Sequence, residues 1–440
     1  MATRRASSTD NRLTSISIEN FKSISSPQVV QVRGLTLLAG ANSSGKSSAM
    51  QPLLLMKQTL EATYDPGTFL LDGPNVRFTS AKQVLSTGKK NFSVGFGIGK
   101  DLRATFNYLL PKTNGLQIAN LTTSSNSSMA AVIRMGMSYE ELRTVTGKWP
   151  DRWPLLATAE MKRSFRVSSD RCLLDLGIYD FPPDFVGFPN DPGRSQIAIR
   201  SFLLNMLHLP GLRGNPERTY KTTSTSNPFP GSFEIYFASV IHQWKIASEA
   251  AKLAELGATM AALGLTSAVT SERVDDTKIE LKVARTTTPK ATRGKSDFVS
   301  IADVGLGVSH VLPVIVALQV AVQDQIVYLE QPEIHLHPRA QVALASVIAR
   351  AVNRGVIVIA ETHSSLLLRG IQTLVAEGEL SGKDVALHWF QRNPKTGKTK
   401  ISHTELDQDG AFGDWPADFD DIQLGSSRQY LDAVAKRHLG

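Results

Sequence analysis

Alternating apolar and polar residues dominate the first quarter of the chain, and alternation of this kind is typical of β-strands. A segment that is apolar on one face interrupts the alternation after Gly40 and indicates a helix. The pattern predicts strands over Leu13–Ile24 and Val29–Leu38, a helix over Ser47–Leu60 and a hairpin over Asn91–Leu110. A strand therefore ends at Gly40 and a helix follows a short loop.

Short apolar runs and longer amphipathic segments alternate in the last third of the chain. The pattern predicts helices over Gly307–Val322, Pro338–Val352 and Ser364–Ala376, and strands over Ile326–Leu329, Val356–Ala360 and Val385–Phe390. Such alternation indicates a parallel sheet that is covered by helices on both faces.

The middle of the chain has weaker patterns. Residues 111–195 are rich in Ser, Pro and Gly and predict no defined element. A helix is expected over Ser195–Leu207, a strand over His208–Leu212, and one or two alanine-rich helices over Phe233–Leu263. The last segment holds no heptad, so a long coiled coil is not expected.

Composition narrows the class of protein. A chain of 440 residues with 42% hydrophobic residues is long enough for one large domain with an insertion, or for two domains. Cys172 is the only cysteine, which excludes an internal disulfide framework and fits a reducing compartment. The first residues lack an apolar signal, and the longest apolar run, Val311–Val322, is too short to span a membrane. We therefore expect a cytoplasmic protein without a membrane contact.

The net charge of +8 permits contact with nucleic acid but does not establish it. The basic residues are scattered, with small clusters only at Lys89-Lys90 and from Lys290 to Lys295, and neither cluster alternates with aromatic residues. A solvated basic surface explains this charge equally well.

The loop after the second predicted strand, Gly40 to Ser47, matches the pattern Gly-x4-Gly-Lys-Ser of a phosphate-binding loop, or P-loop. Backbone amides of such a loop surround phosphates, Lys46 neutralises the β and γ charges, and the Ser47 hydroxyl binds magnesium. A strand before the loop and a helix after it provide the required context. The sequence therefore predicts a site for ATP and Mg²⁺ formed by Gly40, Asn42, Ser43, Ser44, Gly45, Lys46, Ser47 and Ser48.

An apolar strand that ends in carboxylates forms the second motif, Ile326-Val-Tyr-Leu-Glu330-Gln331-Pro332-Glu333. A carboxylate at the carboxyl edge of a parallel sheet can meet a magnesium ion, so Glu330 is predicted opposite Ser47. The motif is weak alone and gains weight from its place downstream of the P-loop, before His335-Leu-His337-Pro338.

Two further motifs lie near predicted element ends. His363 directly follows the strand Val356–Ala360, where a histidine can reach a γ-phosphate or an attacking water, although a lone histidine is more often structural. Asp303-Val-Gly-Leu-Gly-Val-Ser309 places glycines and a serine at a helix start, which fits an anion site or a tight turn.

Together these motifs resemble the ATP-binding heads of the ABC, SMC and Rad50 superfamily. More closely, the chain resembles stand-alone AAA-type ATPases related to the OLD family, such as the Septu and PARIS ATPase subunits of anti-phage defence. The residues that carry the resemblance are Phe21-Lys22-Ser23, Gly40–Ser48, Leu71–Asn75, Leu212-Arg213 with Pro216, Asp303–Pro313, Glu330–Pro338, Glu361–Ser364 and Asp414-Trp415-Pro416.

The resemblance implies an α/β fold, an ABC-type ATPase head that combines a parallel sheet and flanking helices with an antiparallel subdomain. It implies two lobes of this head, with a mixed or helical insertion between them. The expected boundaries are a tail at 1–12, an N-terminal lobe at 13–110, an insertion at 111–284 with 205–220 returning to the core, a C-terminal lobe at 285–425 and a tail at 426–440.

In that superfamily two heads dock head-to-tail on ATP, and the signature helix of one head closes on the γ-phosphate held by the other. Carried over, Gly305, Gly307 and Ser309 form this signature in trans, although the Leu-Ser-Gly-Gly spelling is absent. The resemblance thus implies a dimer of heads or a higher homo-oligomer and a controlled effector partner, such as a nuclease.

Gln331 departs from the family pattern. This position normally carries a glutamate that polarises the attacking water, and an amide cannot accept the proton. Either Glu333 or His363 takes over as the base, or hydrolysis is slow and ATP acts as a long-lived clamp. Three functions stay open: an ATPase that switches a partner, a non-hydrolysing assembly scaffold, and a head that repairs or tethers DNA.

Overall fold

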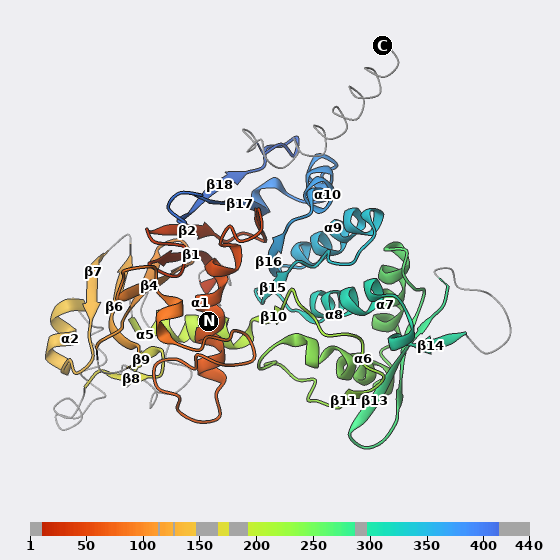
Figure 1. Ribbon diagram of the computed structural model, residues 1–440, viewed down its shortest axis with the longest axis horizontal. Helices are drawn as coiled ribbons and strands as arrows, with labels where there is room; N and C mark the ends of the chain where they lie inside the picture. The colour runs from red at the N-terminus through yellow and green to blue at the C-terminus, as the bar shows by residue number, and fades with distance from the viewer. Residues whose placement is uncertain are drawn as a thin grey trace, which may run out of the picture.

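The computed structural model describes residues 11–112, 115–125, 128–146, 166–175, 192–286 and 297–412 (Figure 1). Asp414-Trp415-Pro416, the two predicted tails beyond these ranges and the cluster Lys290–Lys295 lie outside the described residues. Among the described helices, none combines the length and the apolar character that a membrane crossing requires.

A six-stranded sheet, mostly parallel, forms the centre of the molecule. Its strand order is β10-β15-β16-β3-β17-β18, and only β18 runs antiparallel to its neighbour. The strands are β3 (Leu35–Gly40), β10 (Leu207–Leu209), β15 (Ile326–Glu330), β16 (Ile357–Thr362), β17 (Val385–Arg392) and β18 (Thr399–Glu405). The strand before the P-loop thus lies between two strands from the other end of the chain.

Alternate residues of these strands face two different cores, as expected for a sheet that is buried on both faces. Leu37, Leu329 and Ala360 belong to a core that the helices α8 to α10 cover. Leu38 and Tyr328 belong to a core that α1 and the antiparallel sheet cover. The helices are α1 (Lys46–Glu61), α2 (Tyr139–Thr146), α5 (Pro192–Asn205), α6 (Phe237–Ile246), α7 (Ala250–Ala262), α8 (Leu306–Val320), α9 (Pro338–Asn353) and α10 (Ser365–Ala376).

An antiparallel sheet of order β2-β1-β4-β5-β6-β7 lies on the left of Figure 1. Its interior is aromatic, with Phe92 stacked on Tyr108 at 4.9 Å between ring centroids. The strands are β1 (Leu13–Glu19), β2 (Gln28–Gln31), β4 (Asn91–Ile98), β5 (Leu102–Leu109), β6 (Gln117–Ser125) and β7 (Ser128–Ile133).

Two smaller sheets complete the described structure. The sheet around β13 packs on α6 and α7, on the right of Figure 1. It contains β11 (Tyr220–Lys221), β12 (Val269–Arg273), β13 (Lys278–Ala284) and β14 (Phe298–Ser300), and a separate ribbon pairs β8 (Ser168–Asp170) with β9 (Leu173–Asp175). Single 3₁₀ turns occur at Ala81–Val84, Phe233–Ile235, Ile301–Asp303 and Gly382–Asp384.

The predicted fold class is confirmed, because a parallel sheet with flanking helices stands beside an antiparallel subdomain. Two details differ. The strand predicted over Val29–Leu38 is two strands in different sheets, separated at Arg33-Gly34, and a Cβ on Gly34 would lie 2.8 Å from Val352 Cγ1. The antiparallel sheet continues past residue 110 into β6 and β7, while the domain boundaries stay predictions.

Candidate functional site

The predicted P-loop connects β3 to α1 and packs tightly against the β17–β18 hairpin. Gly40 and Gly45 have φ angles of 145° and 104°, which L side chains rarely adopt. A Cβ on Gly40 would lie 2.4 Å from the Phe390 carbonyl oxygen, and one on Gly45 would lie 2.5 Å from Thr399 Oγ1. Both conformation and space therefore require glycine at these two positions.

Lys46 folds back into the loop that precedes it. Its Nζ donates hydrogen bonds to the carbonyl oxygens of Gly40 and Ala41, each at 2.9 Å, and the side chain is buried. Burial lowers the pKa of Lys46, and the charges of Glu361 and Glu333 act in the opposite direction. The ammonium group thus lies inside the loop, where an anionic phosphate can replace the carbonyl contacts.

Ser47 contacts a carboxylate that the sequence analysis did not select. The Ser47 hydroxyl donates to Glu361 Oε2 at 2.8 Å, and the Tyr328 hydroxyl donates to Glu361 Oε1. Burial foremost, and then the charge of Glu330, raise the pKa of Glu361 to about 7. Glu361 is 2% exposed and lies on β16, directly beside the P-loop strand.

Glu330 is not the hydrogen-bond partner of Ser47, contrary to the expected placement. Its Oε1 lies 3.1 Å from His208 Nε2, and its Oε2 accepts a hydrogen bond from the Gly211 amide at 3.0 Å. Burial acts to raise the pKa of Glu330, but the contacts with His208, Gly211 and Tyr328 lower it below its ordinary value. The reason is strand order, because β16 separates β15 from β3.

Gln331 reaches the P-loop cavity from the end of β15. Its φ is 46°. Its backbone amide donates to the Glu361 backbone carbonyl at 2.9 Å, and its backbone carbonyl accepts from Arg213 at 3.2 Å. The cavity that it lines has a volume of about 690 Å³ and also contains Lys46, Ser47 and His363.

Glu333 is buried behind this cavity. Its Oε1 accepts hydrogen bonds from Thr362 Oγ1 at 2.7 Å and from the His363 amide at 2.9 Å. Burial raises the pKa of Glu333. The side chain thus fixes the turn between β16 and α10, and its role as a base stays a prediction.

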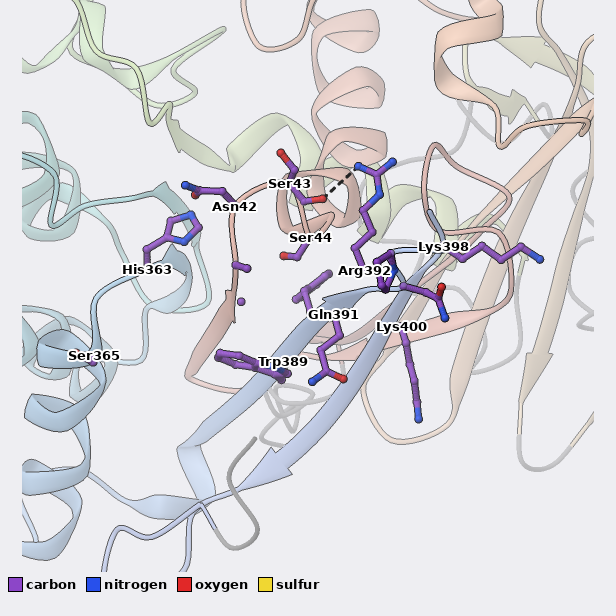
Figure 2. Close-up of a pocket in the computed structure, with 15 residues that line it drawn as sticks. Asn42, Ser43, Ser44, His363, Ser365, Trp389, Gln391, Arg392, Lys398 and Lys400 are labelled. Atoms are coloured by element: carbon purple, nitrogen blue, oxygen red, sulfur yellow. Dashed lines mark hydrogen bonds between the residues drawn. The ribbon is translucent and has the colours of Figure 1, made fainter. Parts of the chain in front are cut away.

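His363 lies beside Asn42 in Figure 2 and lines the cavities on both sides of the P-loop. Burial lowers the pKa of His363, the charge of Lys46 lowers it further, and the Gly40 backbone acts in the opposite direction. A neutral imidazole at this position can accept or donate a hydrogen bond at the phosphate end of the cavity.

A second cavity of about 860 Å³ borders the same loop (Figure 2). Trp389, Arg392, Lys398 and Lys400 line it from the β17–β18 hairpin. Arg392 Nη1 donates to the Ser43 carbonyl at 3.4 Å, so the hairpin is attached to the loop that separates the two cavities.

Of the three predicted signature residues, Ser309 lies at a different cavity. Gly305 caps α8, a Cβ on Gly307 would lie 3.1 Å from the His335 carbonyl oxygen, and Ser309 Oγ donates to the Leu306 carbonyl at 3.1 Å. Ser309 lines a cavity of about 460 Å³, and the residues described around that cavity include none of those around the P-loop cavity.

The residues present fit a nucleotide with magnesium. A lysine ammonium, a serine hydroxyl and one carboxylate, those of Lys46, Ser47 and Glu361, line the cavity together, which is the donor set that phosphates and a magnesium ion require. Magnesium in phosphate sites takes one or two carboxylates together with substrate phosphates and waters. The described residues hold no group of three or more His, Cys, Asp or Glu side chains that could hold a metal ion.

One family profile matches the sequence. It is described as "AAA domain, putative AbiEii toxin, Type IV TA system", and it matches residues 139–369, just over half of the 440 residues. The match begins beyond the P-loop and includes the Glu330 and His363 motifs. No curated protein sequence matches the chain.

Solved structures with a similar fold are heads of SMC proteins. An SMC head bound to the C-winged helix domain of ScpA matches with a TM-score of 0.45 and 12% identity. This match covers 90% of this chain and 98% of the SMC head chain. The SMC head domain from Thermotoga maritima has a TM-score of 0.39 and 10% identity, and the match covers 90% of this chain and 100% of the SMC chain. A Pyrococcus furiosus SMC head with an extended coiled coil has a TM-score of 0.40 and 11% identity, and the match covers 96% of this chain and 99% of the SMC chain.

Proposed function

Since the chain belongs to the family of AAA domains described as putative AbiEii toxin, Type IV TA system, we propose that it is an ATPase that switches a partner protein. One observation carries the proposal: the P-loop residues Lys46 and Ser47 share a cavity with Gln331, Glu361 and His363. These side chains come from three neighbouring strand ends, so the fold gathers them at one edge of the parallel sheet.

The cavity supplies the contacts that the phosphates of a nucleoside triphosphate need. The P-loop amides and the α1 N-terminus bind phosphate oxygens, and Lys46 exchanges its two carbonyl contacts for phosphate. Ser47 and a neighbouring carboxylate hold magnesium, which supplies charge neutralisation at the phosphates. His363 lies at the loop and contacts the terminal phosphate or the water that attacks it.

Replacement of Lys46 tests this function. Lys46→Ala removes the only side-chain ammonium hydrogen-bonded inside the P-loop among the described residues, so phosphate release by the purified protein should fall at least about 100-fold. The matched control is Lys89→Ala, which removes an exposed lysine and should leave release unchanged. Phosphate release that survives Lys46→Ala would refute the assignment.

We further propose that the site is completed by a second copy in a head-to-tail dimer. The support is the separation of the P-loop cavity from the one that contains Ser309. Gly305, Gly307 and Ser309 begin α8, and their amides and hydroxyl suit a γ-phosphate held by another copy.

The proposed target of the switch is an effector protein, a nuclease of an anti-phage defence system. The family description names a toxin and a TA system, and this supports a partner protein. The net charge of +8 leaves direct contact with nucleic acid open as well.

A non-hydrolysing scaffold is the second candidate, and Gln331 favours it. Gln331 lines the P-loop cavity at a position where a glutamate is expected, and an amide accepts no proton from water. In that case ATP holds two copies together without turnover. Wild-type protein that binds ATP, dimerises and releases no phosphate would identify the scaffold.

A further inference from the structure

Two carboxylates compete for the role of magnesium ligand at the sheet edge. Glu330 and Glu361 are paired in register at the ends of β15 and β16. Only β16 is a direct neighbour of β3, the strand that opens into the P-loop. Glu361 is therefore one strand nearer to the phosphates than Glu330.

The spacing between Ser47 and Glu361 suits a shared metal ion. Magnesium binds oxygen ligands octahedrally at 2.0–2.1 Å, so adjacent ligands lie about 2.9 Å apart. Ser47 Oγ and Glu361 Oε2 are 2.8 Å apart. The two oxygens need little movement to exchange their hydrogen bond for contacts to one cation.

Both carboxylate oxygens of Glu330 have hydrogen-bond partners other than Ser47. His208 Nε2 and the Gly211 amide occupy Oε1 and Oε2. His208 is 1% exposed, its Nδ1 lies 2.9 Å from Asn75 Nδ2, and its ring stacks on Tyr328 at 5.3 Å between centroids. Reorienting Glu330 toward Ser47 would break this buried arrangement.

We propose that Glu361, together with Ser47, is the protein ligand of the metal ion that accompanies the nucleotide, and that Glu330 is a positioning residue. This assignment rests on the proposed function. Tyr328 donates its hydroxyl proton to Glu361 Oε1 and contacts Glu330 as well, so the buried tyrosine fixes the orientation of Glu361. Oε2 is then directed at Ser47.

Binding of Mn²⁺ to the full chain, measured by electron paramagnetic resonance with saturating ATPγS, tests the assignment without relying on turnover. Glu361→Gln should weaken Mn²⁺ binding about 100-fold or more, because loss of a residue that only supports a ligand already costs 10- to 100-fold in affinity. Glu330→Gln should weaken it less. Glu405→Gln, an exposed change on β18, is the matched control and should have no effect.

Nucleotide binding in EDTA separates the two levels of the proposal. If the wild type binds ATPγS but the wild type and Glu361→Gln have equal Mn²⁺ affinity, the metal assignment alone is overturned. A Glu330→Gln loss as large as that of Glu361→Gln overturns it too. Failure of the wild type to bind ATPγS with or without metal overturns the proposed function and this assignment together.

Glu361→Asp guards against a folding defect in the glutamine variant. It keeps the carboxylate but withdraws it from Ser47 by one methylene, so an intermediate Mn²⁺ affinity is expected. Thermal unfolding of each variant shows whether it is folded. Wild-type Mn²⁺ affinity in a folded Glu361→Asp protein overturns the assignment.

Discussion

Gln331 is the residue whose chemistry most affects how the site works. Its backbone has a φ of 46°, a conformation that costs a non-glycine residue about 1–3 kcal/mol. Arg213, 5% exposed, donates to the backbone carbonyl of Gln331, and the backbone amide of Gln331 donates to the backbone carbonyl of Glu361. The strained turn is thus held from two sides at the P-loop cavity, which Gln331 lines.

Replacing this amide by a carboxylate should restore a general base. Gln331→Glu keeps the number of non-hydrogen atoms in the side chain, and a positioned base typically contributes about 10²–10⁴ in rate. Single-turnover phosphate release should therefore be at least about tenfold faster than in the wild type. An unchanged rate would show that another group, such as His363, already serves as the base.

Among the residues that line the cavity, sequence patterns could identify the P-loop, Gln331 and His363, but not the partners of these residues. The spacing of Gly40, Gly45, Lys46 and Ser47 identified the loop, because phosphate binding itself imposes that spacing. Glu361, the proposed metal ligand, was not predicted as a site residue, although it directly follows the predicted strand Val356–Ala360 and precedes His363 by two positions. Which strand end lies beside the P-loop depends on strand order, and a local pattern carries no information on order.

The helix α1 links the nucleotide loop to the carboxylate end of β15. Gln58, 1% exposed, donates to the carbonyls of Leu70 and Val76 and accepts from the amides of Asn75 and Val76. Asn75 in turn contacts His208, the partner of Glu330. One helix therefore fixes a loop that positions a residue on a distant strand.

Gln58→Leu should expose the importance of this link. The change keeps the volume but leaves the Leu70 carbonyl and the amides of Asn75 and Val76 without their partner, whereas the Val76 carbonyl keeps its bond from the Gly73 amide. Each unsatisfied buried group costs about 1–3 kcal/mol. The free energy of unfolding in urea should fall by about 2–5 kcal/mol, since part of the loop can reach water. Gln83→Leu, at an exposed position, is the control, and an equal loss in both variants would contradict the idea.

Elements with strong apolar patterns were predictable, and polar ones were not. The helices α9 and α10 and the strand β15 lie within a few residues of their predicted bounds, because one face or the whole strand is apolar. The strand β6, with the sequence QIANLTTSS, escaped prediction. Its threonines and serines suit the pleated surface, but they blur the contrast on which the pattern depends.

At the scale of the whole molecule, the two halves of the proposed ATP site line separate cavities of the described structure. Lys46 and Ser47 line one cavity, and Ser309 lines another. A contact between copies related by a twofold axis would bring each type of surface against the other twice. The proposed dimer therefore contains two equivalent sites.

ATP should convert the protein into such a dimer. Native mass spectrometry should show a monomer-to-dimer shift with ATP and Mg²⁺, because the terminal phosphate supplies the contact between the two surfaces. ADP should give less dimer, and Lys46→Ala should give none with either nucleotide. A wild-type protein that stays monomeric with bound ATP would contradict the head-to-tail arrangement.

The position of β3 has a consequence for synthesis of the protein. This apolar strand is complete when residue 40 is made, yet its two sheet neighbours are β16 and β17, which end at Thr362 and Arg392. At about 5–20 residues per second, a ribosome needs roughly 20–70 s to supply them. During that time both edges of β3 lack their native partners, and an unpaired apolar edge is prone to aggregation. Newborn chains should therefore depend on chaperones until the last strands emerge.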